Sequence, residues 1–379
     1  MTFRGLAAAL LLTACAAPAM AAERRLEATL DADTPIEIEN LIGDARVIPG
    51  DGPLRVTARV SADDADLADA VRLELDEGRR QRLSVAYPEE VSDFRIESGG
   101  HGRLNTTVSY RGRRVDISSS RGERIRADLE IHVPAGAAVK LTTVAGDVHA
   151  EAVDADLALR TRHGGIAVAD GQGSLVADTG SGSVDIAGFR GDVRADTGSG
   201  DVRVENVLGR VVGDTGSGAV MLRGIDGDVV ADTGSGDVTL LDVNASTIKA
   251  DTGSGGVEIS DASGSLLVDT GSGGLRAEGF TAGPSVEVDT GSGRVEIDGD
   301  LSAVERLIVD TGSGSVALAS SAPLSLRLDL DTGSGGIRVD VPELSDVRST
   351  RSRFRGTAGT GRGSARVDTG SGSIRVSGP

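Results

Sequence analysis

The pentapeptide DTGSG occupies residues 178–182 and occurs ten times in the chain. Its aspartates stand at positions 178, 196, 214, 232, 251, 269, 289, 310, 331 and 368. The successive intervals are 18, 18, 18, 19, 18, 20, 21, 21 and 37 residues, and a period this regular is typical of stacked-repeat proteins. The degenerate copies RTRHG at 160–164 and TTVAG at 142–146 continue the period backward. We therefore expect the repeats to begin near Val139.

Aliphatic and polar residues alternate on both sides of the pentapeptide. Val193 and Ala195 stand three and one residues before Asp196, with Arg194 between them. Another aliphatic residue follows each Asp by six positions, at 184, 202, 220, 238, 257, 275, 295, 316, 337 and 374. A period of two indicates half-buried strands. By the same parity, the Asp of the motif faces outward and the Thr inward.

Each repeat is thus predicted to contain a strand, a Gly-Ser-Gly turn, a second strand and a second turn. Eighteen residues are too few for a four-stranded propeller blade, and no segment shows a helical period. We predict an all-β fold, a single-chain parallel β-solenoid (β-helix) of about 18-residue coils. Roughly 13 coils would make a rod of some 60 Å. The 37-residue interval before Asp368 predicts one coil that has lost its motif, near residues 349–355.

The region before the repeats is less regular but still strand-like. We assign residues 22–138 to an N-terminal β cap and insert, and 139–379 to the solenoid, because the first coil of a solenoid needs its strand edge covered. IENLIGDARV at 38–47 looks like a divergent coil, and DADLADAV at 64–71 like a helical turn. Two arginine clusters are interpreted as charged protection of strand edges, with binding of anionic envelope polymers or lipid headgroups as the alternative. They comprise Arg111, Arg113, Arg114, Arg121, Arg124 and Arg126, and Arg348, Arg351, Arg353 and Arg355.

The first 21 residues, MTFRGLAAALLLTACAAPAMA, have the features of a secretory signal peptide. Arg4 precedes a short apolar run, and Ala19 and Ala21 end it in the pattern of a cleavage site. We expect cleavage after Ala21, while LTAC at 12–15 leaves lipidation of Cys15 open. The protein is then exported to the periplasm, the cell envelope or the exterior, or is an outer-membrane lipoprotein. We expect membrane attachment only through such a lipid anchor.

Composition narrows the range of partners. The 379 residues carry a net charge of −19, with 58 acidic against 39 basic residues. Because nucleic-acid binding needs a basic face, we expect no nucleic-acid partner. We expect the protein to be a monomer. We expect it to bind no cofactor, with calcium as the one ion left open. The four histidines, at 101, 132, 149 and 163, are scattered, and there are seven aromatic residues. We therefore expect no enzyme, with a carbohydrate-active β-helix as a remote alternative.

The letters DTGS are similar to the active-site signature of pepsin-like aspartic proteases. That chemistry needs two carboxylates that share a proton in a cleft between two lobes. Ten equivalent copies one coil apart do not single out such a pair. A calcium-binding β-roll also has 18-residue coils, but its Asp follows the glycines. Looser calcium binding by the column of aspartates stays open, since Ca²⁺ prefers oxygen ligands. The candidate ligands are Asp178, Asp196, Asp214, Asp232, Asp251, Asp269, Asp289, Asp310 and Asp331.

Our preferred interpretation of the pentapeptide is turn chemistry. We expect the Asp to accept hydrogen bonds from backbone N–H groups two or three residues on, and Gly to supply positive φ. Carboxylates stacked about 4.8 Å apart would repel each other by about 1 kcal/mol per pair even in water. Cation binding or an outward splay of the side chains is therefore expected as well.

Taken together, the chain resembles a bacterial family of exported, adhesin-like β-strand-repeat proteins whose domain has no assigned function. The resemblance rests on the signal peptide, on IENLIGDARV, on Val133-Pro134 followed by AVKLTTVAGDV at 138–148, and on ARVDTGSGSIRV at 365–376. It implies an exported β-solenoid at the cell envelope with an unidentified envelope or surface ligand, and it transfers no catalytic residues. We expect a non-enzymatic scaffold or interaction protein, with a calcium-binding solenoid as the alternative.

Overall fold

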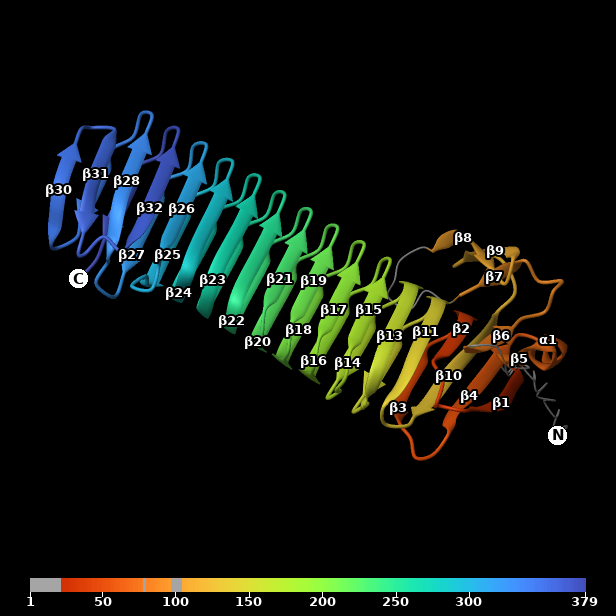
Figure 1. The fold of residues 1–379 in the computed structure, drawn as a ribbon. Coiled ribbons are helices and arrows are strands. Elements are labelled where there is room, and N and C mark those ends of the chain that lie inside the picture. The colour runs from red at the N-terminus through yellow and green to blue at the C-terminus, as the bar shows by residue number, and fades with distance from the viewer. Residues whose placement is uncertain (1–21, 78–79, 97–103) are drawn as a thin grey trace, which may run out of the picture.

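The structure, a computed structural model, describes residues 22–77, 80–96 and 104–379. Cys15, the cleavage site after Ala21, and His101 lie outside these residues. The chain forms a nearly all-β parallel solenoid of about 12 turns, with about 19 residues per coil and 2% helix. The predicted fold class is therefore confirmed. Figure 1 shows the coils as a straight rod, with the N-terminal elements gathered at one end.

Each regular coil has two main sides and a short third side. The first side holds β11 (Ala137–Ala145), β13 (Ala155–His163), β15 (Leu175–Thr179), β17 (Val193–Thr197), β19 (Val211–Thr215), β21 (Val229–Thr233), β26 (Arg306–Thr311), β32 (Gly363–Thr369) and β28 (Leu326–Thr332). The second side holds β12 (Val148–Glu151), β14 (Ile166–Ala169), β16 (Val184–Arg190), β18 (Val202–Leu208), β20 (Val220–Asp226), β25 (Val295–Asp300), β27 (Val316–Ser320), β33 (Ile374–Ser377) and β29 (Ile337–Asp340). Three long strands continue from the second side onto the first: β22 (Val238–Thr252), β23 (Val257–Thr270) and β24 (Leu275–Thr290).

The core is built from columns of identical or similar aliphatic side chains. Val184, Val202 and Val220 stack in register on the second side, and each is fully buried. Val193 and Ala195 belong to the matching columns of the first side and are also buried. Small aliphatic residues suffice because each coil covers the next, so the predicted inward positions are confirmed in the regular coils.

The N-terminal elements close one end of the rod. The strand β2 (Ile36–Ile42) pairs in parallel with β11, and β3 (Ala45–Pro49) pairs in parallel with β12. The segment IENLIGDARV is therefore a coil, as the sequence predicts. Around it lie β1 (Ala22–Leu30), β4 (Leu54–Ala62), β5 (Arg72–Glu77), β6 (Gln81–Ala86) and β10 (Ile125–Val133). Antiparallel pairing of β4 on β10, of β1 on β4 and of β5 on β6 covers the free edges.

A small sheet and a short helix complete this end. The strands β7 (Asp93–Arg95), β8 (Asn105–Tyr110) and β9 (Arg113–Ser118) form a separate three-stranded sheet. The helix α1 (Ala65–Ala70) begins after Asp64, whose side chain accepts a hydrogen bond from the backbone N–H of Asp66. This confirms the helical turn predicted there. Within the described ranges, no helix is long and apolar enough to cross a membrane.

The other end of the rod differs from the sequence prediction. Residues 349–355 do not belong to a coil without a motif; they lie in a hairpin of β30 (Leu344–Ser349) and β31 (Arg353–Ala358). The strand β31 pairs antiparallel with β28 and caps it. The coil of β32 and β33 then lies between the coil of β26 and β27 and the coil of β28 and β29 (Figure 1). A hairpin with the same alternation and length as a coil cannot be told from one by its period.

Candidate functional site

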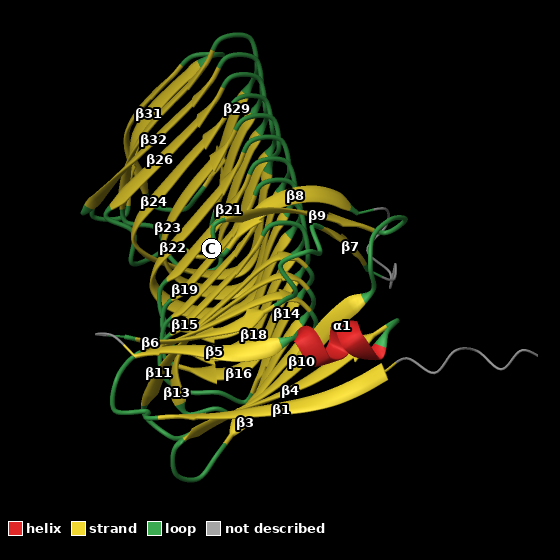
Figure 2. Ribbon diagram, turned by 90° about the vertical axis from the view of Figure 1, so that its right-hand side faces the viewer, coloured by secondary structure: helices red, strands yellow, loops and turns green. Residues whose placement is uncertain are grey.

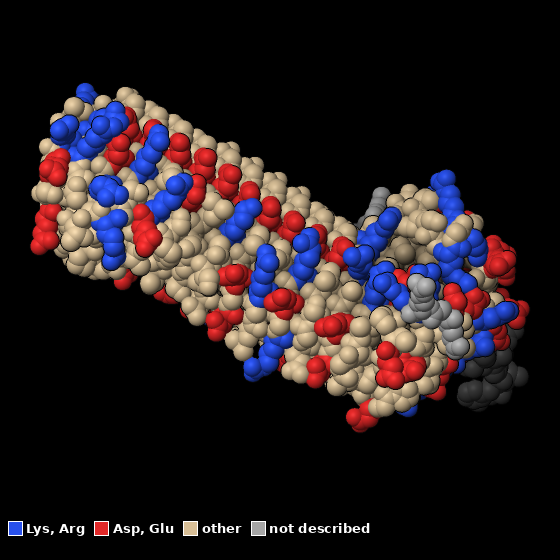
Figure 3. Space-filling model, in the orientation of Figure 1, with Lys and Arg blue, Asp and Glu red and all other residues tan. Residues whose placement is uncertain are grey.

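The motif aspartates form a single row along the first side, which we call the aspartate ladder. From β15 onward each Asp pairs in register with the Asp of the next coil. The order at the end is Asp289, Asp310, Asp368 and Asp331, because of the inserted coil. The side chains point outward and are exposed or half-exposed, as predicted. Figure 3 shows a row of acidic side chains along the rod.

Arginine side chains stand at both ends of the ladder. The Arg160 Nε lies 3.6 Å from Asp178 Oδ2 in the first rung, and Arg353 Nε lies 3.7 Å from Asp331 Oδ2 in the last. Asp368, which the sequence analysis leaves out of the candidate ligands, is an internal rung between Asp310 and Asp331. Its DTGSG motif is complete, and only the long interval before it in the sequence hid its position in the ladder.

Neighbouring carboxylates inside the ladder repel one another and so disfavour the charged form of each other. The pKa values of Asp214, Asp232 and Asp289 are raised, first by burial and then by neighbouring ladder carboxylates. Asp232 is affected from both sides, by Asp251 and Asp214, while Lys249 opposes the shift. The ladder is therefore an electrostatic cost to the fold, which arginines offset in part. Besides the arginines at its two ends, Arg194 lies 3.1 Å from Asp196 and Arg366 lies 3.9 Å from Asp368.

The Thr of the motif, and not the Asp, makes the hydrogen bonds of the turn. The Thr197 Oγ1 donates to the carbonyl oxygen of Gly182 in the preceding coil at 2.8 Å and accepts from the backbone N–H of Gly200 at 3.2 Å. The same pair of bonds recurs at Thr215, Thr233 and Thr252. The expectation that Asp accepts the turn N–H groups is therefore wrong, because the buried hydroxyl lies nearer to them.

The motif needs glycines because neighbouring coils stack too closely to leave room for a Cβ atom. A Cβ on Gly182 would lie 1.9 Å from the carbonyl oxygen of Gly164, and one on Gly180 would lie 2.6 Å from that of Arg162. In the part of the chain that the structure describes, no motif glycine has a left-handed φ, so the expected role of positive φ is also wrong. Left-handed glycines occur instead at the second turn, as at Gly191 with φ of 124°.

The candidate metal ligands do not converge on one point. Across the described residues, no group of three or more His, Cys, Asp or Glu side chains could hold a metal ion. Each ladder Asp offers its carboxylate from a separate coil, whereas Ca²⁺ takes 6–8 oxygen ligands. The ladder is therefore a repeating charged surface, with one carboxylate per coil.

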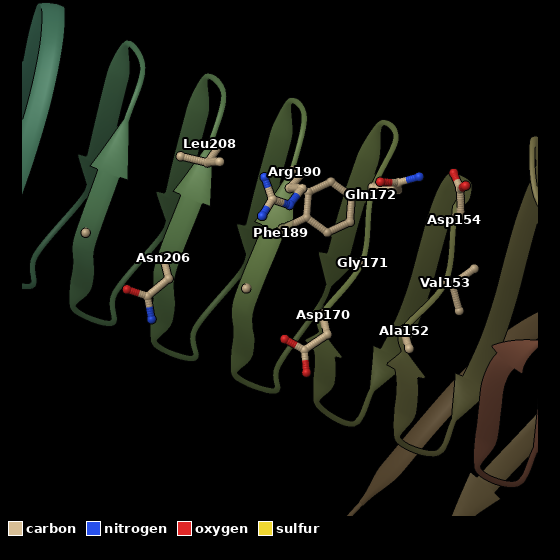
Figure 4. Close-up of a pocket in the computed structure, with 12 residues that line it drawn as sticks. Ala152, Val153, Asp154, Asp170, Gly171, Gln172, Phe189, Arg190, Asn206 and Leu208 are labelled. Carbon is tan, nitrogen blue, oxygen red and sulfur yellow. The ribbon is translucent and has the colours of Figure 1, made fainter.

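A cavity of about 680 Å³ lies along the third side of the coils from β12 to β20. Figure 4 shows Asp154, Gln172 and Arg190 near its outer edge, with Asp170 and Asn206 at the corner toward the second side. The ring of Phe189 is fully buried and fills the space that Gly171 leaves, since a Cβ there would lie 2.8 Å from Phe189 Cε2. A ring in this position cannot act as a sugar-stacking platform.

A second cavity, of about 900 Å³, lies where the three-stranded sheet meets the rod. His149 and His163, which are far apart among scattered histidines in the sequence, both line it. The Nδ1 of His163 lies 3.2 Å from Ser181 Oγ, while its Nε2 is buried and has no hydrogen-bond partner among the residues that the structure describes. Burial, followed by the charge of Arg162, lowers the pKa of His163. The cavity is formed by residues of the first coils together with Arg95 and Ile96 at β7, so the sequence pattern carried no signal for it.

Both arginine clusters make internal ion pairs and hydrogen bonds. Arg124 pairs with Asp63, and Arg126 pairs with Asp44 and Asp128. At the other end Arg355 pairs with Asp329 at 3.1 Å, beside the Arg353 pair at the end of the ladder. These contacts favour the structural interpretation of the clusters as charged cover for strand edges.

Comparison with known proteins yields a family and several solved structures. A family described as Toastrack DUF4097 matches residues 188–377. A structure from Clostridium sporogenes, provisionally named a cell adhesion protein, is 9% identical with a TM-score of 0.21, over 94% of this chain and 100% of that one. One from Parabacteroides distasonis, provisionally named a lipid-binding protein, is 15% identical with a TM-score of 0.35, over 78% and 95%. Another from that organism, provisionally named an adhesin, is 12% identical with a TM-score of 0.30, over 79% and 98%. No curated protein matches the chain.

Proposed function

The chain belongs to the Toastrack DUF4097 family, and from this premise we propose that it is a non-enzymatic scaffold or interaction protein, adhesin-like, exported to the cell envelope. One observation carries the proposal: the coils stack in parallel from β2 and β3 to β28 and β29, with local register shifts along the long strands β22 to β24. The polar atoms of the motif serve this stacking, because the Thr hydroxyl and the glycines join neighbouring turns. Such a rod is suited to present a surface at a fixed distance.

The character of the surfaces supports a role without catalysis. All aromatic rings in the described residues are buried or half-buried, and the rings of Phe189 and Phe280 are fully buried. A carbohydrate-active site would need exposed rings beside paired carboxylates. The ladder carboxylates, in contrast, repeat at the same turn of successive coils, and the raised pKa values at Asp214, Asp232 and Asp289 follow from burial and from neighbouring rungs. This repetition does not set one carboxylate apart as an acid and another as a base.

Export is supported by the first 21 residues, whose pattern is that of a signal peptide. The acidic surface keeps such a rod soluble and selects against anionic partners. We place the interaction surface on the first side, where the ladder presents one carboxylate per coil to an envelope or surface ligand that carries complementary positive charge.

The test is retention of the mature chain, residues 22–379, by isolated cell envelopes from the source bacterium. We expect the wild type to sediment with the envelopes at low salt. The triple variant Asp214→Asn, Asp232→Asn and Asp251→Asn should be retained several-fold less, because it removes three consecutive charges from the ladder. A matched control, Glu205→Gln, Glu258→Gln and Glu278→Gln, changes the same charge on the second side and should leave retention unchanged.

Two outcomes would contradict the proposal. A wild-type chain that stays in the supernatant at every salt concentration would exclude an envelope ligand. Equal losses from the ladder variant and the control would show that net charge, and not the ladder, decides retention.

A further inference from the structure

The cavity between the three-stranded sheet and the rod has two unpartnered nitrogen atoms in its wall. Among the side chains that the structure describes, three buried polar atoms have no hydrogen-bond partner. Two of them, Arg95 Nε and His163 Nε2, belong to residues that line this cavity, and the third is Thr143 Oγ1 in the first side of the rod. Buried polar atoms are nearly always paired with protein, water or a ligand. The two nitrogens therefore need a partner that the described part of the chain does not supply.

Arg95 ends β7 and is held in place by its backbone and by its guanidinium group. Its backbone N–H donates to the carbonyl oxygen of Glu123 at 2.9 Å, and its Nη2 donates to Asp63 Oδ2 at 3.2 Å. An arginine Nε always carries a proton and can only donate. The missing partner of Arg95 Nε is therefore a hydrogen-bond acceptor. A negatively charged acceptor is favoured, because the hydrogen bond is then charge-assisted.

His163 belongs to the side of the cavity that the rod forms, at the end of β13. In the pairing of β13 with β15, Thr161 lies beside Thr179, so His163 takes the place that Ser181 has in the next coil. Its Nδ1 lies 3.2 Å from the Oγ of that serine, and this contact orients the ring. The degenerate copy RTRHG thus departs from the motif at a residue that lines the cavity, and it leaves Nε2 to bind a ligand.

The carboxylates of the cavity wall already have partners. Asp63 pairs with Arg95 and Arg124, Asp147 accepts a hydrogen bond from the N–H of Gly165 at 2.7 Å, and Asp185 pairs with Arg203 at 3.0 Å. A cationic ligand would have to displace one of these partners. An acceptor, in contrast, meets two nitrogens that lack one.

Apolar side chains make up another part of the wall. Ile42, Ile125 and Ile166 are buried there, whereas Ile96 and Leu104 are only half-buried. Figure 1 and Figure 2 show the three-stranded sheet beside the first coils of the rod. The volume of about 900 Å³ is within the range of pockets that hold one small molecule, roughly 300–1,000 Å³. The cavity thus combines apolar surface with a few polar atoms, as small-molecule sites do.

We propose that this cavity binds one small anionic amphiphile, a molecule with a carboxylate or phosphate head group and an apolar body. The head group accepts a hydrogen bond from Arg95 Nε–H, His163 Nε2 makes a second polar contact, and the apolar body covers Ile96 and Leu104. An apolar molecule without a head group would leave both nitrogens unpaired, which is costly for buried polar atoms. No aspartate of the ladder lines the cavity, so the site is independent of the proposed envelope role.

The first test is calorimetric titration of the mature chain, residues 22–379, with decanoate and with decyl phosphate below their critical micelle concentrations. We expect one site per chain with a Kd of about 1–100 µM. Decanol has the same apolar body without the charge and should bind at least about tenfold more weakly. Acetate and inorganic phosphate should also bind more weakly, because they bury no apolar chain. The tighter of the two anions identifies the head group.

Two substitutions remove the unpartnered nitrogens one at a time. Arg95→Gln removes Nε and the positive charge, while its amide can still donate to Asp63, and it should raise the Kd for decanoate about tenfold or more. His163→Ser introduces the side chain that the next coil has at this position and should raise the Kd several-fold. Arg46→Gln is the matched charge control. Arg46 pairs with Glu151 at 3.2 Å and does not line the cavity, so the Kd should stay unchanged.

NMR spectra of the imidazole rings locate the ligand on the wild-type chain. Either anion should shift the ring signals of His163 and leave those of His132, which contacts Glu130 and does not line the cavity, in place. Decanol that binds as tightly as decanoate, equal losses from Arg95→Gln and Arg46→Gln, or an unresponsive His163 ring would each overturn the proposal. A chain that binds neither anion would show that water satisfies the two nitrogens, and would overturn it without affecting the envelope test.

Discussion

The Thr215 hydroxyl joins two coils: it donates a hydrogen bond of 2.8 Å to the carbonyl oxygen of Gly200 and accepts one of 3.2 Å from the N–H of Gly218. Replacing Thr215 by Val keeps the shape and leaves two partly buried backbone groups without this partner. We expect the free energy of unfolding to fall by about 1–3 kcal/mol. Urea denaturation measures the loss, and hydrogen exchange at the Gly218 amide should show where it arises.

Thr143 offers a control in the same column. Within the described part of the chain its Oγ1 is buried without a hydrogen-bond partner, so Thr143→Val removes a desolvated hydroxyl and no bond to a described residue. Stability should stay within about 0.5 kcal/mol of the wild type or rise. Equal losses at positions 143 and 215 would show that the methyl packing, and not the hydroxyl, matters.

Neutralising an internal rung of the ladder should stabilise the rod. Asp232 lies between Asp214 and Asp251, and burial with these neighbours raises its pKa above the ordinary 3.8. A carboxyl with a raised folded-state pKa destabilises the fold at neutral pH, and protonation relieves this as the pH falls through that pKa. Asp232→Asn should therefore add a few tenths to about 1 kcal/mol at pH 7, less at high salt. The gain should shrink as the pH falls through the raised pKa and vanish below the ordinary value of 3.8.

Asp178 is the matched control at the end of the ladder. It has a carboxylate neighbour on one side only and pairs with Arg160 on the other, at 3.6 Å. Asp178→Asn should be neutral or slightly destabilising in the same urea titrations. A gain at Asp178 as large as at Asp232 would contradict repulsion between rungs as the cause.

The N-terminal region should respond to acid in the opposite direction. Hydrogen bonds from Lys140 and then Arg82 lower the pKa of Glu37 below its ordinary 4.5, against burial, and its side chain is 12% exposed. The stability that this carboxylate contributes is fully present above pH 4.5 and is lost as the pH falls through its lowered pKa. We expect Glu37→Gln to cost about 1–3 kcal/mol at pH 7, and the difference from wild type to shrink below pH 4.5. Glu27→Gln, at an exposed pair with Arg25, should cost less than about 0.5 kcal/mol at either pH.

A methyl group at a glycine of the stacked turns should destabilise the fold. Gly182→Ala would place a Cβ 1.9 Å from the backbone oxygen of Gly164 in the preceding coil, so the coils must separate locally. We expect a loss of several kcal/mol, or failure to fold, by thermal melting. Gly336, beside the last motif, has no atom within 4 Å of a Cβ position and serves as the control. Gly336→Ala should be neutral or stabilising, because alanine restricts the unfolded chain.

Calcium should act on the ladder only as an electrolyte. Since one carboxylate per coil does not enclose a cation, Ca²⁺ should raise the melting temperature no more than NaCl of equal ionic strength. Melting in calcium, in chelator and in matched NaCl measures this. A larger, saturable shift with calcium would instead support the calcium-binding alternative.

Periodicity predicted most of the rod, because each coil repeats the same burial pattern. The inward Thr, the outward Asp and the coil at Gly43 all follow from two patterns: side chains that alternate every two residues, and a repeat of about 18 residues. The motif chemistry was harder to predict, since Asp and Thr are both good turn acceptors and only the stacking places the Thr hydroxyl beside the turn amides. The cavity shared by His149 and His163, and the hairpin at 344–358, depend on contacts between segments that carry no common pattern.

The position of β32 and β33 beneath β28 and β29 bears on how the rod can change in length over evolution. Residues 363–377 are made after residues 326–340, yet they lie between those residues and the rest of the rod. A chain that emerges N-terminus first must therefore hold the outer coil off the stack, or release it, until the inner one arrives. Copying a coil in the middle of the rod leaves this closing step untouched, whereas copying one at this end disrupts it.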